Sequence, residues 1–140
     1  MQAITAAQAK RVDALVRDLE RVFGPRVQSI GGYDANDGSG RIHTLVIVDR
    51  VTFADLGACV PLADDWLRHG IAVPLILGRD ELRRTMDIFP LEYAAMAATL
   101  TPIRGANPFD AAVPAREDVR RALETQAIVR GSRERAQKIP

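Results

Sequence analysis

The central stretch of this chain reads Val27-Gln28-Ser29-Ile30-Gly31-Gly32-Tyr33, then DANDGSGR at 34–41, then Ile42-His43-Thr44-Leu45-Val46-Ile47-Val48-Asp49. The residues at 34–41 are turn formers, so the two flanking segments are predicted to be strands joined by a hairpin loop. The second strand is apolar without a break at 45–48, which is typical of a central strand covered on both faces. Gly31 and Gly32 indicate close approach of another backbone or a bulge in the first strand.

Amphipathic helices are predicted on both sides of this hairpin. Residues 5–23 carry apolar side chains at intervals of three and four, and Gly24-Pro25 ends the pattern. Residues 52–69 repeat the pattern, with Thr52 as the N-cap and Gly70 as the C-cap.

The second half of the chain gives a weaker pattern. Residues 71–77 are predicted to be a strand, and Pro74 within it favours an edge position or a bulge. Residues 79–85 are predicted to be a short polar helix. Residues 87–98 are predicted to continue as a strand, although the alanine-rich part equally suits a helix. Residues 101–114 are predicted to form a loop with at most a short strand, and Pro114 is predicted to begin a final helix that ends near residue 129.

This order predicts an α/β (α+β) fold: a small mixed β-sheet of about four strands, with helices packed mainly on one face. The length of 140 residues fits a single domain over 1–140, in which 114–140 form a terminal helix and a basic tail.

Composition excludes several classes of function. The chain is 47% hydrophobic and 26% charged with a net charge of +1, which is typical of a soluble globular protein without a field that would attract nucleic acid or an anionic membrane. Residues 116–140 carry 7 Lys/Arg against 4 Asp/Glu, but the acidic residues are interleaved and no aromatic residue is among them. Cys59 is the single cysteine, and no signal peptide or membrane span is evident, so we expect a cytoplasmic protein.

The chain resembles a known family in two places. The hairpin at 27–49 is similar in outline to the first hairpin of the nucleotidyltransferase-like, polymerase-beta-type superfamily. The phrases VPLIL at 73–77, DELRR at 80–84 and DIFPLEY at 87–93 resemble a group of bacterial proteins of that kind, as do GANPF at 105–109 and the Arg/Glu-rich 116–129. The resemblance covers roughly residues 10–129.

The resemblance also implies where catalytic residues would lie, and this chain departs from that pattern. Active members carry Gly-Ser at the end of the first strand, where this chain has Asp34-Ala35, and Asp-x-Asp at the start of the second, where it has Arg41-Ile42-His43. Two divalent metals need clustered hard oxygen ligands, which Arg and His do not supply. For the third carboxylate, which comes from a later strand, the candidate is Glu92 rather than Asp87. We therefore expect no catalytic residues and no metal site.

The hairpin loop remains the candidate site for residual nucleotide binding. The residues that we assign to it are Gly32, Asp34, Ser39, Gly40, Arg41 and His43. A glycine-rich loop with an arginine is able to hold a phosphate, yet without a following helix an ordinary turn is the simpler interpretation. Likewise, His43 is simply explained as a strand-surface residue, Cys59 as a buried thiol, and Glu92 as a solvent-facing residue.

The sequence thus predicts a catalytically inactive nucleotidyltransferase-like domain that acts as a binding or interaction module. We expect no cofactor and a protein partner or self-association; a nucleotide is a candidate for an additional ligand. One alternative is a divergent active nucleotidyltransferase that uses Mg²⁺, in which Asp34, Asp49 or Glu92 regroups around the metal. Another alternative is an antitoxin-like regulatory module, by analogy of fold.

Overall fold

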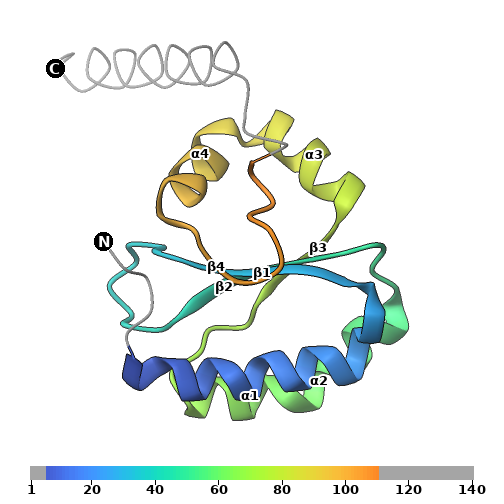
Figure 1. Cartoon of the computed structure of the whole chain (residues 1–140), viewed down its shortest axis with the longest axis vertical. Coiled ribbons are helices and arrows are strands. Elements are labelled where there is room, and N and C mark those ends of the chain that lie inside the picture. The colour runs from blue at the N-terminus through green and yellow to red at the C-terminus, as the bar shows by residue number, and fades with distance from the viewer. Residues whose placement is uncertain (1–5, 111–140) are drawn as a thin grey trace, which may run out of the picture.

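The computed structural model describes residues 6–110, which form four helices, a short 3₁₀ turn and four strands (Figure 1). In chain order they are α1 (Ala6–Phe23), η1 (Gly24–Arg26), β1 (Val27–Tyr33), β2 (His43–Val48), α2 (Phe53–Arg68), β3 (Leu75–Gly78), α3 (Arg79–Ile88), α4 (Pro90–Thr99) and β4 (Thr101–Arg104). No helix within 6–110 has the length and apolar character needed to cross a membrane. The predicted final helix and basic tail at 114–140 lie outside the described residues.

The strands form one mixed sheet in the order β3-β2-β1-β4. β1 is antiparallel to both β2 and β4, and β2 is parallel to β3. The predicted fold class and the mixed sheet of four strands are therefore confirmed. Pro74 precedes β3, which is an edge strand as the proline predicted.

Helices cover both faces of this sheet, so the prediction of helices mainly on one face is wrong (Figure 1). Alternate side chains of β2 point to opposite faces: Val46 and Val48 enter the core under α1 and α2, whereas Leu45 and Ile47 enter the core under α3 and α4. The unbroken apolar run at 45–48 already indicated burial on both faces. The second helical layer was not predicted because residues 87–98 were assigned as a strand.

That segment is the helix α4, which begins at Pro90. Proline is tolerated in the first turn of a helix because its missing N–H has no partner there, and the five residues 94–98 include four alanines, the best helix formers. The alternation of Phe89, Leu91 and Tyr93 suggested a strand, but only Tyr93 is buried among the three. The strand of this region is instead β4, at the start of the predicted loop.

Gly31 explains how β4 and α4 meet the hairpin. A Cβ atom at this position would lie 2.8 Å from a methyl carbon of Leu100, which joins α4 to β4. The close approach that the glycine pair predicted is thus a contact with the Leu100 side chain. It allows β4 to pair with β1, with Gly31 opposite Pro102 and Gly32 opposite Thr101.

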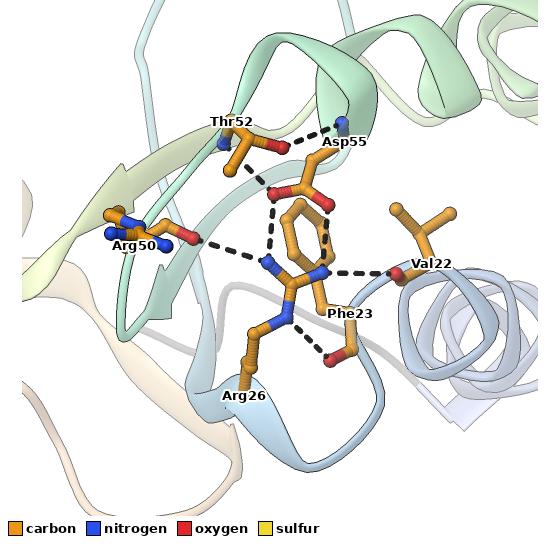
Figure 2. Close-up of polar contacts among 6 residues, drawn as sticks. All are labelled: Val22, Phe23, Arg26, Arg50, Thr52 and Asp55. Carbon is orange, nitrogen blue, oxygen red and sulfur yellow. Dashed lines mark hydrogen bonds and ion pairs between the residues drawn. The ribbon is translucent and has the colours of Figure 1, made fainter.

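A partly buried ion pair joins the 3₁₀ turn η1, just before β1, to the first turn of α2 (Figure 2). The guanidinium of Arg26 donates to both carboxylate oxygens of Asp55, over 2.9 and 2.7 Å, and to the carbonyl oxygens of Val22 and Phe23. The same carboxylate accepts the backbone N–H of Thr52 at 2.9 Å, and the Thr52 hydroxyl accepts from Asp55 N, which completes a capping box. The ion pair therefore fixes the entry of α2 relative to the sheet.

Candidate functional site

The hairpin loop borders a pocket of about 360 Å³. Because β1 and β2 are antiparallel and Tyr33 pairs with His43, the end of β1 and the start of β2 lie at the same edge of the sheet. Residues 34–38 and 40–43 line the pocket, and Thr99 at the end of α4 and Gln8 of α1 complete its wall. The pocket thus lies at the place that the sequence assigned to a residual site.

The structure brings four of the six predicted binding residues to this pocket: Asp34, Gly40, Arg41 and His43. Gly32 does not line it. Gly32 is buried within β1, where it pairs with Thr44 on one side and Thr101 on the other. Ser39 does not line the pocket either, and its hydroxyl and amide are used within the loop.

Side chains of the loop bond to the loop's own backbone. Asp34 accepts the N–H of Asn36 at 2.8 Å, and Asp37 accepts the N–H and the hydroxyl of Ser39 at 3.0 and 2.8 Å. The N–H of Arg41 donates to the Ser39 hydroxyl over 3.2 Å. These are the local bonds that Asp, Asn and Ser make in turns. Three amides that a phosphate would need are already occupied, which favours the turn interpretation of the glycine-rich loop.

His43 and Asp37 form the polar wall of the pocket. His43 Nε2 lies 3.1 Å from an Asp37 carboxylate oxygen, within ion-pair distance, but this buried nitrogen makes no hydrogen bond. The two bonds from Ser39 and the nearby His43 together hold the pKa of Asp37 below its usual value. The ring of Tyr33 lies 5.8 Å from that of His43, and burial raises the pKa of the Tyr33 hydroxyl.

None of the four strands contains an aspartate or a glutamate. The carboxylates near the pocket belong to the loop, and no group of three or more His, Cys, Asp or Glu residues within 6–110 is placed to hold a metal ion. A two-metal site requires several oxygen ligands that converge on the ions. The residues at the pocket therefore do not fit a pair of Mg²⁺ ions.

The other acidic candidates lie elsewhere. Asp49 follows β2, and its N–H donates to the carbonyl oxygen of Arg26. Asp34 lies near the start of β2, so the six extended residues of this strand separate the two acids by about 20 Å. Glu92 is exposed in the first turn of α4, about 10 Å along the helix from Thr99. Asp87 is exposed in the last turn of α3.

Sequence reasoning missed Thr99. Its hydroxyl accepts the N–H of Asp34 over 3.0 Å and so holds the start of the loop against the end of α4. The contact could not be predicted because residues 87–98 were assigned as a strand. That assignment did not place residue 99 near the hairpin. An alanine-rich helix with a threonine at its end was the available signal.

The single cysteine does not take part in this site. Cys59 is buried in the core under α1 and α2, and burial raises the pKa of its thiol, which disfavours the reactive thiolate. The expected buried thiol is what the structure shows.

Comparisons with known proteins give a likeness to solved structures alone. No family model matches this chain, and no curated protein matches it. One similar structure is that of a tri-AMPylated HEPN toxin of Shewanella oneidensis in complex with an MNT antitoxin: the matched chain is 14% identical, the match covers 93% of this chain and 98% of that one, and the TM-score is 0.49. Another is the toxin–antitoxin MntA–HepT, with 12% identity, 92% and 95% coverage, and a TM-score of 0.45.

Proposed function

We propose that this chain is a catalytically inactive nucleotidyltransferase-like domain that acts by binding another protein chain. The observation that carries the proposal is the absence of any carboxylate from strands β1 to β4. In the superfamily that the hairpin resembles, metal ions are held by acids on strands. At the corresponding start of β2, Arg41 and His43 line the pocket instead.

The alternative of a divergent active enzyme requires Asp34, Asp49 or Glu92 to regroup around a metal. Asp34 and Asp49 follow strands that run in opposite directions, and about 20 Å of β2 separates them. Bringing them together would require unpairing β2 from the centre of the sheet. This cost disfavours an active site built from these acids.

Nucleotide binding tests the proposal. We expect ATP or GTP, with Mg²⁺ or Mn²⁺, to leave the melting temperature unchanged and no label to pass from labelled ATP to protein. A ligand at a hundredfold excess over its dissociation constant would stabilise the fold by about 2.7 kcal/mol, which a melting experiment detects. An active nucleotidyltransferase is the positive control. A metal-dependent rise in melting temperature that Asp34→Ala or Glu92→Ala abolishes would overturn the proposal.

An antitoxin-like regulatory module is a second candidate. The exposed apolar pair Ile88 and Phe89, 67% and 49% exposed at the junction of α3 and α4, favours it, because a chain without transferase chemistry neutralises a toxin only by contact. The similar chains come from toxin–antitoxin complexes, so a HEPN toxin is the partner to test first.

The assay compares growth of cells that express the toxin with this chain or with its Ile88→Asp variant. Equal protection by both would exclude this pair as the contact.

A further inference from the structure

The outer side of α2 presents apolar side chains to solvent. Phe53, Leu56 and Val60 recur at intervals of three and four on this helix and are 94%, 47% and 70% exposed. Asp55 is the only charged residue from 53 to 63, and it turns inward to Arg26. The first three turns of α2 therefore show no charge to solvent, although an exposed helix face is ordinarily polar.

A groove of about 370 Å³ lies beside these residues. Leu56 and Val60 form one wall, and Val73 and Pro74, which lead into the edge strand β3, form the other. Trp66 is among the residues that line the groove. We use the name α2 surface for the ridge of Phe53, Leu56 and Val60 together with this groove.

We propose that the α2 surface binds a second copy of the same chain about a twofold axis, with the Phe53 ridge of each copy in the groove of the other. An isologous contact requires one patch that is complementary to itself, and this patch holds both a protrusion and a recess. This proposal rests on the proposed function, because it assumes that the chain acts by binding a protein. It adds the surface that binds and the partner that is bound.

The size and the chemistry of the patch fit a dimer. Phe53 alone exposes on the order of 200 Å², and with its neighbours the patch reaches a few hundred Å², a size at which exposed apolar patches are often functional. A standard interface buries about 800 Å² per partner, of which roughly 500 Å² is apolar. The absence of charge matches the depletion of charged residues at interface centres, and it offers nothing that would select a charged partner.

The remainder of the chain is a poorer occupant. The described part ends just beyond Phe109, which belongs to the core under α3 and α4, on the opposite face of the sheet from α2 (Figure 1). A segment continuing from Asp110 would have to pass around the sheet to reach the α2 surface, whereas a second copy needs no such path.

The mass of the full chain in solution tests the dimer. In light scattering or sedimentation over a range of micromolar concentrations, we expect twice the 15.3 kDa of one chain. Val60→Asp places a charge at the centre of the contact and is expected to weaken the dimer at least about a hundredfold. Ile88→Asp is the matched control, because Ile88 is 67% exposed against 70% for Val60 but lies on the α3 side of the sheet.

Folding is checked by the melting curve of each variant. If Val60→Asp does not fold, Phe53→Ser provides the same test from the end of the helix. A monomeric wild type at every concentration overturns the proposal and leaves the α2 surface to a different protein. A folded Val60→Asp variant that remains dimeric overturns it as well. Neither result bears on the nucleotide experiment, so failure of the dimer is distinguishable from failure of the proposed function.

Discussion

Asp55→Ala is expected to lower the free energy of unfolding by about 3 kcal/mol. The Asp55 carboxylate, with only 9% of its side-chain surface exposed, accepts two bonds from Arg26 and one from the backbone of Thr52. Its removal leaves a guanidinium in a partly buried position and half of a capping box. The loss falls at the lower end of the range for broken buried ion pairs, because 36% of the Arg26 side chain stays in contact with water.

The effect of Asp55 is also expected to depend on pH. The hydrogen bonds from Arg26, followed by those from Thr52, hold the pKa of Asp55 well below its usual value. A lowered carboxyl pKa stabilises the fold fully above the unfolded-state value of about 4, and this contribution is lost as the pH falls below it. The difference in stability between the wild type and Asp55→Asn should therefore narrow as the pH falls below about 4.

Denaturant unfolding of Asp55→Ala, Asp55→Asn and the wild type at neutral and acid pH measures both effects. Asp64→Ala is the matched control, because Asp64 is an exposed acid on the same helix and its loss should cost less than about 0.5 kcal/mol. If Asp55→Ala cost no more than this control, the ion pair would not hold α2 in place.

The double substitution Arg41→Asp with His43→Asp is expected to create metal binding where the wild type has none. Residues 41 and 43 both line the pocket, as residues two apart at the start of a strand do. The substitution would place two acids two residues apart at the mouth of the hairpin. Asp37, whose carboxylate lies 3.1 Å from His43 Nε2, would be a third oxygen ligand.

Three acids in one pocket repel one another in the absence of a cation, so the double variant should be less stable than the wild type without metal. Mn²⁺ should then raise its melting temperature, and a hundredfold excess over the dissociation constant corresponds to about 2.7 kcal/mol. Arg41→Asn with His43→Asn is the control, since it removes the same side chains without adding ligands. An equal response of the control and the aspartate variant would mean that the pocket does not place these positions together.

The strongest local patterns predicted most of the fold. The apolar run at 45–48, the turn residues at 34–41 and the helical periodicity of 5–23 correspond to β2, the hairpin loop and α1. The segment 87–98 was misassigned because its short apolar run fits both periods, and burial of Tyr93 against Phe109 in the second core decides between them. That contact joins residues 16 positions apart, beyond the reach of local periodicity.

The pocket lies at the predicted hairpin loop, and four of the six residues assigned to the candidate site line it. The loop and the pair Arg41 and His43 lie where the hairpin placed them. The distances of Asp49 and Glu92 from the loop depend on strand direction and on the helical state of α4, which residue spacing does not reveal. The contact between Thr99 and the loop was not predicted either, because it depends on α4 being a helix that ends beside the hairpin.

Manganese binding by the wild-type chain tests the central claim most directly. Mn²⁺ is titrated into the protein in the presence of ATP and followed by electron paramagnetic resonance, with the aspartate double variant as the positive control. The account predicts that the wild-type spectrum stays that of Mn²⁺ with ATP in solution. One Mn²⁺ ion bound per chain, and lost on substitution of Asp34 or Asp37 by alanine, would contradict it.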